Sequence, residues 1–151
     1  MRLLSLDVGQ RRIGVAIADP TGTIATPLMT IVRETREQDF AAIAEVVTKH
    51  EVGQVVVGLP LSLDGSESGQ ARTTKRFADV LQRRLSVPVV LWDERFTTVE
   101  AEAILLRTRS AGARRKARDR GEVDAIAAAV ILQSYLDSAA EQGRGEQGGE
   151  T

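Results

Sequence analysis

Residues 3–18, with the sequence LLSLDVGQRRIGVAIA, decide the fold that this chain is expected to adopt. Two short apolar runs, residues 3–8 and 13–18, are separated by a short polar stretch, which is typical of a strand, a tight turn and a second strand. Residues 23–32 form a third, less regular extended pattern, and Pro27 favours an edge position or a bulge within it. Connections this short predict an antiparallel meander of three strands.

The remainder of the chain alternates helical and extended patterns. Two helices are expected to begin with capping boxes, at Thr35 and Thr97. Apolar residues recur at helical spacing in residues 35–50, 74–85, 97–106 and 122–138. Continuous apolar runs, residues 54–59 and 87–92, predict strands buried on both faces. The order β-β-β-α-β-α-β-α-α predicts an α/β fold with a mixed five-stranded sheet, an antiparallel meander followed by parallel crossovers, flanked by helices.

The composition limits the chemistry. The 151 residues suffice for one domain, expected over residues 1–138, with a charged, glycine-rich and disordered tail over residues 139–151. The absence of cysteine excludes disulfides and thiolate zinc sites, and the single histidine, His50, excludes sites that need two imidazoles. Any metal ligands are therefore mostly oxygen atoms. No apolar run approaches the roughly 18 residues of a membrane helix, so we expect a cytoplasmic protein without a membrane partner.

Carboxylates stand where the predicted parallel strands end, which is where sites lie in open sheets of this kind. Asp7 interrupts an apolar strand, and Asp93 and Glu94 follow the last one. Because adjacent residues of a strand point to opposite faces, only one of Asp93 and Glu94 can face Asp7. Asp93 more simply begins a turn, so Glu94 is the better candidate. A third carboxylate, Asp124, lies in the first turn of the last predicted helix, beside its buried stripe.

These carboxylates also have structural explanations. Asp7 could pair with Arg11 or Arg12, or accept hydrogen bonds from the turn amides, and the helix dipole alone favours an acidic residue at Asp124. If Asp7, Glu94 and Asp124 converge, their mutual repulsion requires a cation. Oxygen ligands without cysteine or histidine suit Mg²⁺ or Mn²⁺. Such ions, in pairs about 4 Å apart, activate water for phosphodiester cleavage.

Four motifs, in chain order, resemble those of one known family. They are DVG and RRIGVA at residues 7–9 and 11–16, VGLPL and DGS at 57–61 and 64–66, DERFTT at 93–98, and VDA at 123–125. The resemblance, which spans residues 1 to about 138, is to the YqgF/RuvX-like family of Holliday junction resolvase-like proteins, also described as pre-16S ribosomal RNA nucleases. It implies a ribonuclease H-like fold and an endonuclease that requires Mg²⁺ or Mn²⁺. It also implies that Asp7, Glu94 and Asp124 are the catalytic and metal-binding residues.

The substrate remains open between three interpretations. The resemblance implies processing of the 5′ end of the 16S ribosomal RNA precursor in ribosome maturation, or, by fold similarity, cleavage of four-way DNA junctions. A noncatalytic RNA-binding maturation factor with the same fold is a third interpretation. Junction resolution requires a homodimer with two sites, whereas RNA trimming can use a monomer.

Basic residues near these positions are candidates for nucleic-acid binding, although each is also compatible with an ordinary solvated charge. Arg11 and Arg12 lie in the first predicted turn, and Arg95 follows the last predicted strand. Residues 107–120 hold seven Lys or Arg and one Asp, a charge of +6. The candidates in this connection are Arg114, Arg115, Lys116 and Arg118. Because only 3% of the residues are aromatic, recognition is expected to depend on shape and phosphate backbone rather than on base stacking.

Overall fold

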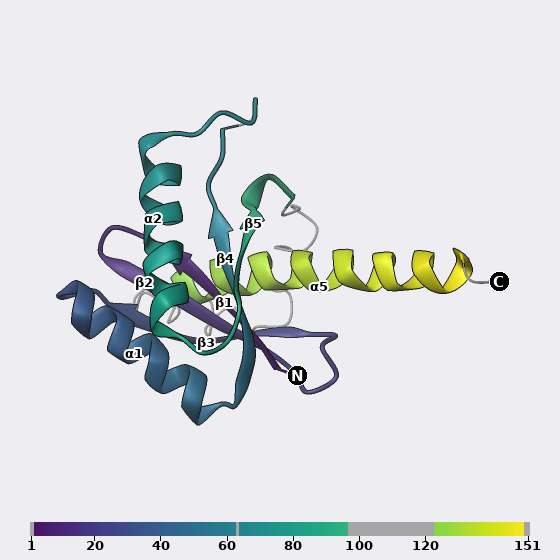
Figure 1. Ribbon diagram of the computed structural model, residues 1–151, viewed down its shortest axis with the longest axis horizontal. Coiled ribbons are helices and arrows are strands. Elements are labelled where there is room, and N and C mark those ends of the chain that lie inside the picture. The colour runs from purple at the N-terminus through teal and green to yellow at the C-terminus, as the bar shows by residue number, and fades with distance from the viewer. Residues whose placement is uncertain (1, 63, 97–122, 150–151) are drawn as a thin grey trace.

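The computed structural model describes residues 2–62, 64–96 and 123–149, which form a mixed five-stranded sheet between two layers of helices (Figure 1). The strands are β1 (Arg2–Val8), β2 (Arg12–Ala18), β3 (Ala25–Val32), β4 (Val52–Leu59) and β5 (Val89–Asp93). The helices are α1 (Arg36–Lys49), α2 (Gly69–Arg84), the short 3-10 helix η1 (Glu94–Phe96) and α5 (Val123–Gly149). In the order β3-β2-β1-β4-β5, the first three strands pair antiparallel, while β4 pairs parallel with both β1 and β5. The predicted meander followed by parallel crossovers is therefore confirmed.

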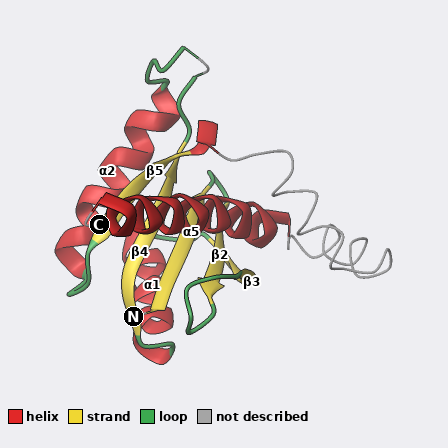
Figure 2. Ribbon diagram, turned by 90° about the vertical axis from the view of Figure 1, so that its right-hand side faces the viewer, coloured by secondary structure: helices red, strands yellow, loops and turns green. Residues whose placement is uncertain are grey.

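Alternation along β1 separates the two faces of the sheet. Leu4, Leu6 and Val8 belong to the core on the side of α1 and α2. Ser5 and Asp7 point to the opposite face, which α5 crosses (Figure 2). Asp7 therefore lies on the side of the sheet that is covered by the last helix.

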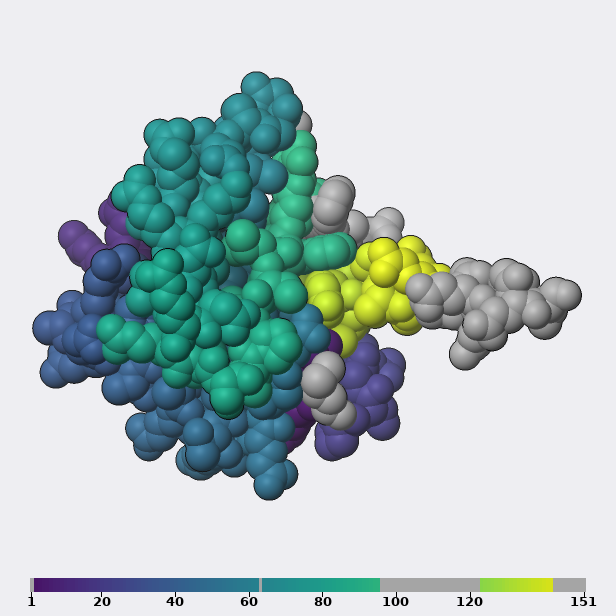
Figure 3. All heavy atoms as spheres, in the orientation of Figure 1, coloured from purple at the N-terminus to yellow at the C-terminus, as the bar shows by residue number. Residues whose placement is uncertain are grey.

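The face under α5 is built from small side chains. Ala16 of β2 packs there against Ala128 and Ala129, so the helix approaches the sheet closely. The buried Ser5 hydroxyl donates a 2.6 Å hydrogen bond to the carbonyl oxygen of Ala128, which satisfies the one polar group of β1 that is fully buried on this face. Farther along, the yellow part of α5 extends beyond the body of the molecule (Figure 3). The packed half of the helix is thus its N-terminal half.

Two local predictions are confirmed at residue level. The Thr35 hydroxyl accepts from the amide of Gln38 at 3.2 Å, and the Gln38 side chain accepts from the amide of Thr35 at 3.3 Å, which is the expected capping box of α1. Pro27 lies on the edge strand β3, where the pairing with β2 shifts register between Val15 and Ala16. An edge position tolerates the missing N–H of proline.

The prediction of a strand buried on both faces at residues 87–92 is wrong. β5 lies at the edge of the sheet formed by the described residues, and Leu91 is 38% exposed. Part of the apolar run instead packs under α5, through Val90 and Trp92. A continuous apolar run therefore marks contact with helices here rather than a central place in the sheet.

The last helix is longer than predicted. α5 continues to Gly149, so residues 139–149 are helical where a disordered tail was expected. Residues 139–142, Ala-Ala-Glu-Gln, are good helix formers and extend a helix that packing already stabilises. The glycines farther on suggested disorder, but in the structure they do not end the helix.

One stretch of α5 resembles a membrane span by length and composition. Among the described residues, Val123–Gln142 is long and apolar enough to cross a membrane, which the sequence analysis did not anticipate. Half of this stretch is buried inside the fold, and its alanines pack against the sheet. The contact with the sheet accounts for its apolar character. The expected helix over residues 97–106 and the basic connection over 107–120 lie outside the described residues.

Candidate functional site

Asp7 lies between two glycines of neighbouring strands. Its partner on β2 is Gly14. On the other side Leu6 pairs with Val57, which places Gly58 next to Asp7 across the parallel pair. Because neither glycine has a side chain, the Asp7 carboxylate is flanked by backbone on both sides.

The carboxylate of Asp7 is not neutralised by a neighbouring base. Within the described residues it forms no hydrogen bond or ion pair, so pairing with Arg11 or Arg12 does not explain its presence in the strand. The amide of Gly9, in the turn that follows, donates instead to the carbonyl of Arg12 at 2.9 Å. Burial, together with the nearby carboxylate of Asp124, raises the pKa of Asp7 from 3.8 to about 6.

Asp124 reaches Asp7 because α5 begins directly on β2. A Cβ atom at Gly14 would lie 1.8 Å from the carbonyl oxygen of Asp124 and 2.9 Å from the amide nitrogen of Ala125. The missing side chain therefore lets the first turn of α5 rest on the strand at the position that pairs with Asp7. The side chain of Asp124 is 34% exposed, and Arg12 Nη1 lies 4.0 Å from its Oδ2.

Glu94 reaches the same face from the other side of Asp7. A Cβ atom at Gly58 would lie 2.8 Å from Glu94 Oε1 and 2.6 Å from Ile131 Cδ1, so the glycine provides the space that the glutamate occupies. Burial, followed by the carboxylates of Asp7 and Asp93, raises the pKa of Glu94 from 4.5 to about 7. The expectation that Glu94 rather than Asp93 faces Asp7 agrees with this arrangement.

Asp93 has a different role, at the start of η1. Its Oδ1 accepts from the amide of Arg95 at 2.9 Å, and its Oδ2 accepts from Nε at 2.9 Å and Nη2 at 2.6 Å of the same arginine. These hydrogen bonds lower the pKa of Asp93. Arg95 in turn lies against the loop after β4, where a Cβ atom at Gly65 would be 3.2 Å from its Nη1. The sequence expectation of Asp93 as a turn residue is thus consistent with its contacts.

Asp7 is the shared member of two interacting carboxylate pairs, one with Asp124 and one with Glu94. In the part of the chain that the structure describes, no three acidic or imidazole side chains lie close enough together to hold one ion. The donor chemistry nevertheless fits a hard divalent cation, because the carboxylate oxygens of Asp7, Glu94 and Asp124 are the ligand type that Mg²⁺ and Mn²⁺ prefer. A cation beside them would also offset the burial and the mutual repulsion that raise the pKa values of Asp7 and Glu94.

The predicted nucleic-acid contacts divide into described and undescribed residues. Arg12 points toward Asp124, whereas Arg11 lines a separate hollow on the other side of the β1–β2 turn, and Arg95 is held by Asp93. The remaining candidates, Arg114, Arg115, Lys116 and Arg118, lie outside the described residues. The contact of Gly58 with Glu94 was not predicted from the sequence, although a glycine inside a strand is a signal of close approach.

Comparison with known proteins assigns the chain to a family. The model of the RuvX family, described as a Holliday junction resolvase family, matches residues 1–138. The chain belongs to this family. The RuvX-family chain is 43% identical over 138 residues to a protein of Thermoanaerobacter pseudethanolicus named "Putative pre-16S rRNA nuclease", covering 91% of this chain and 97% of that protein. It is 51% identical over 137 residues to a protein of the same name from Anaeromyxobacter sp. (strain Fw109-5), again covering 91% and 97%.

Solved structures of low sequence identity share the fold. RuvC of Thermus thermophilus superposes with a TM-score of 0.58 at 16% identity, covering 92% of this chain and 97% of RuvC. The Fowlpox virus resolvase, solved with Holliday junction DNA, superposes with a TM-score of 0.57 at 14% identity, covering 92% and 99%. The expected ribonuclease H-like fold is thereby confirmed.

Proposed function

We propose that this RuvX-family chain is a divalent-metal-dependent endonuclease that processes the 5′ end of the 16S ribosomal RNA precursor in the cytoplasm, with residues 1–138 as its nuclease domain. The observation that carries the proposal is the convergence of two partly buried carboxylates, Asp7 and Glu94, with the start of α5, through the close approaches at Gly14 and Gly58. The raised pKa values of Asp7 and Glu94 agree with this convergence. The name shared by the curated relatives supports the choice of precursor ribosomal RNA.

Asp7 has the central role in this proposal because it interacts with both other carboxylates. Asp7, Glu94 and Asp124 would hold Mg²⁺ or Mn²⁺ through their oxygen atoms. When bound, the ion supplies a lowered pKa for water and neutralises charge on the scissile phosphate. The glycines on either side of Asp7 give up their side-chain space to the start of α5 and to Glu94, which brings all three carboxylates to one place.

Basic residues near the carboxylates would position the substrate. Arg12, beside Asp124, would bind a phosphate that flanks the scissile bond. Arg95 would do so from the other side, with Asp93 fixing its guanidinium. Arg11, in the same turn as Arg12, would bind a phosphate farther along the strand, because it lies on the other side of the turn. We assign Arg114, Arg115, Lys116 and Arg118 to longer-range electrostatic attraction of the phosphate backbone.

A cleavage panel tests the proposal. Substrates are a 5′-extended 16S ribosomal RNA precursor, single-stranded RNA of the same length and a four-way DNA junction, each with Mg²⁺, Mn²⁺ or EDTA. We expect metal-dependent cleavage of the precursor that is abolished in Asp7→Asn, while circular dichroism shows an intact fold. Asp79→Asn is the matched control, because Asp79 is exposed on α2 and should leave cleavage unchanged. Retained cleavage by Asp7→Asn with Mn²⁺ would overturn the assignment.

The same panel separates the other interpretations. Preferential cleavage of the four-way junction would favour the activity that the family description names, and light scattering would then have to show a homodimer. Tight RNA binding that is equal in EDTA and in Asp7→Asn, without cleavage of any substrate, would indicate a noncatalytic maturation factor.

A further inference from the structure

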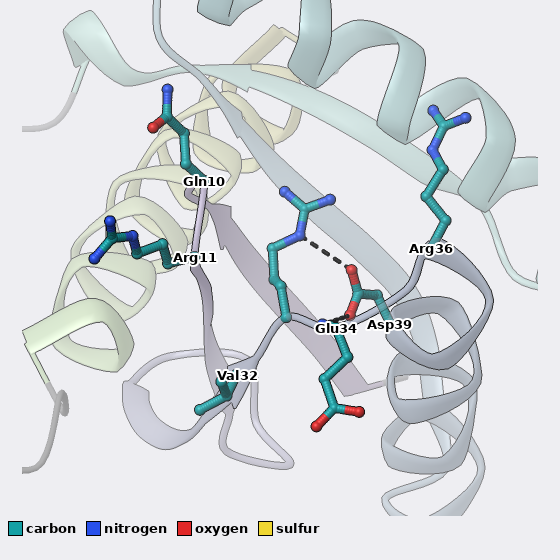
Figure 4. A pocket seen from close by; sticks show the side chains of 7 residues that line it. Gln10, Arg11, Val32, Glu34, Arg36 and Asp39 are labelled. Carbon is teal, nitrogen blue, oxygen red and sulfur yellow. Dashed lines mark hydrogen bonds and ion pairs between the residues drawn. The ribbon is translucent and has the colours of Figure 1, made fainter.

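A hollow of about 550 Å³ lies between the β1–β2 turn, the end of β3 and the start of α1 (Figure 4). It is on the α1 side of the sheet edge, whereas the carboxylate of Asp7 points to the α5 side. Its lining consists of Gln10, Arg11, Val32, Arg33, Glu34, Arg36 and Asp39. None of the proposed catalytic residues contributes to it.

The wall of this hollow is a fixed network of hydrogen bonds. Asp39 is 3% exposed and accepts from Arg33 Nε and from the amide of Glu34, both at 3.1 Å. Arg33 Nη1 also donates to the carbonyl oxygen of Gly9 at 2.8 Å, which ties the β1–β2 turn to the start of α1. The guanidinium of Arg33 lies 5.4 Å from the centre of the Phe77 ring. Arg33 and Asp39 therefore neutralise each other and hold the surrounding elements in place.

Two further guanidinium groups at the hollow are not neutralised in this way. Arg11 and Arg36 are exposed, and neither forms a hydrogen bond or ion pair with another residue in the described ranges. The carboxylate of Glu34 points away from both of them (Figure 4). Glu37, the first acidic residue of α1, is bound by Arg84 through contacts of 2.6 and 2.7 Å, and its interaction with Arg36 is a weaker electrostatic one. The hollow is thus left with unpaired positive charge.

The position of Arg36 is not explained by the stability of α1. It is the first residue of that helix, where a positive charge opposes the helix dipole. An arginine there is unfavourable for the helix but well placed for an anion, because the amides at the start of a helix also favour negative charge.

The β1–β2 turn connects this hollow with the carboxylate site. Arg12 points to Asp124 on the α5 side, and its neighbour Arg11 lines the hollow on the α1 side. The amide of Arg33 donates to the carbonyl of Arg11 at 2.9 Å and so fixes the turn between them. A phosphate backbone that crosses the turn can therefore meet guanidinium groups on both sides of the sheet edge.

We propose that this hollow, the Arg36 pocket, binds the phosphate backbone of the nucleic-acid substrate away from the scissile bond. Arg11 and Arg36 lie on different sides of the hollow (Figure 4), so each contacts its own phosphate of the strand, and the Arg33–Asp39 pair holds the elements that carry them. This inference rests on the proposed function, because it assumes a substrate whose phosphodiester backbone reaches Asp7.

The salt dependence of binding tests the Arg36 pocket. Binding is measured by fluorescence anisotropy between 50 and 200 mM NaCl. All proteins carry Asp7→Asn, so that the nucleic acid is not cleaved. The two probes, measured separately, are a 5′-extended ribosomal RNA precursor fragment and a four-way DNA junction. Loss of one phosphate contact should lower the slope of log K against log salt by about 0.7 to 0.9, which corresponds to roughly five- to eightfold weaker binding at 0.1 M salt. We expect this change for Arg36→Gln with at least one probe, and the probe affected identifies RNA or DNA as the ligand.

Lys49→Gln is the matched control. Lys49 is exposed in the last turn of α1, at the opposite end of that helix from Arg36, and its replacement changes the net charge equally. The control should leave the slope unchanged with both probes. If Asp7→Asn with Arg36 intact binds both probes, and the added Arg36→Gln change leaves the slope unchanged with both, the Arg36 pocket is overturned. The proposed function is not affected by that result. Failure of Asp7→Asn with intact Arg36 to bind either probe counts against the proposed function.

Discussion

Replacing Gly14 by alanine is expected to separate Asp124 from Asp7 without altering either carboxylate. The added Cβ atom would lie 1.8 Å from the carbonyl oxygen of Asp124 and 2.3 Å from its carbonyl carbon. These are backbone atoms, so no side-chain rotation can relieve the contact. Real Cβ atoms keep at least 3.0 Å from such neighbours, and the start of α5 must therefore move away from β2 by about 1.2 Å or more.

This displacement should slow cleavage strongly while the protein remains folded. A misplacement of about 1 Å in a catalytic group can lower the rate roughly 100-fold, whereas overpacking of this kind costs about 1–3 kcal/mol of unfolding free energy. We expect Gly14→Ala to cut the precursor about 100-fold more slowly in single-turnover assays while urea unfolding still shows a folded protein. Gly69→Ala is the control, because its Cβ atom would meet only Arg72 Nη2, at 3.9 Å. Single-turnover cleavage by Gly14→Ala within threefold of the wild type would refute the reasoning.

Two further predictions concern the other carboxylates. In Gly58→Ala the new methyl group would displace the ends of Glu94 and Ile131, both of which are flexible side chains. We expect roughly tenfold slower cleavage, with less than about 1.5 kcal/mol of unfolding free energy lost in urea. Cleavage at the wild-type rate would contradict the role of Gly58. Because the pKa of Asp7 is raised to about 6 and that of Glu94 to about 7, their contribution to folding stability in EDTA is fully present below pH 4 and is lost as the pH rises through 7. A pKa shift of one unit corresponds to about 1.4 kcal/mol of unfolding free energy. In EDTA at pH 8, Asp7→Asn should therefore be more stable than the wild type by up to about 3 kcal/mol. This difference should vanish near pH 4, where Asp7 of the wild type is protonated in the folded protein. Urea unfolding at the two pH values measures it, and a wild type that is at least as stable as Asp7→Asn at pH 8 would disprove the electrostatic account.

The local rules predicted most of the sheet and the choice between two adjacent carboxylates. Residues 3–18 predicted the first hairpin because alternation and a four-residue turn leave few other pairings, and β1 and β2 form it. The same alternation allowed only one of Asp93 and Glu94 to face Asp7, and the turn-forming tendency of Asp93 favoured Glu94, which the structure places near Asp7. These predictions depend on the period of a strand and on local turn chemistry, both of which can be read from the sequence.

The features that the sequence did not predict depend on contacts between distant segments. The contact of Gly58 with Glu94 requires the order of β1, β4 and β5 in the sheet, which motifs alone do not provide. The Arg36 pocket combines the first turn with the start of α1, two segments that are separate in sequence. The exposure of Leu91 likewise follows from the edge position of β5 rather than from its composition.

The hydrogen bond between Ser5 and Ala128 makes β1 the common reference for Asp7 and Asp124, two of the carboxylates proposed to be catalytic. Ser5 and Asp7 are two residues apart on one strand, about 6.7 Å, while Asp124 and Ala128 are four residues apart on one helix, about 6 Å. Because the two spacings are similar, α5 can bond to Ser5 at Ala128 while Asp124 contacts Gly14, the residue of β2 that pairs with Asp7. The contacts of α5 with β1 and β2, at Ser5 and Gly14, consequently fix the distance between Asp124 and Asp7. A change at Ser5, a residue that carries no charge and would bind no metal, should therefore disturb the carboxylate site through the helix.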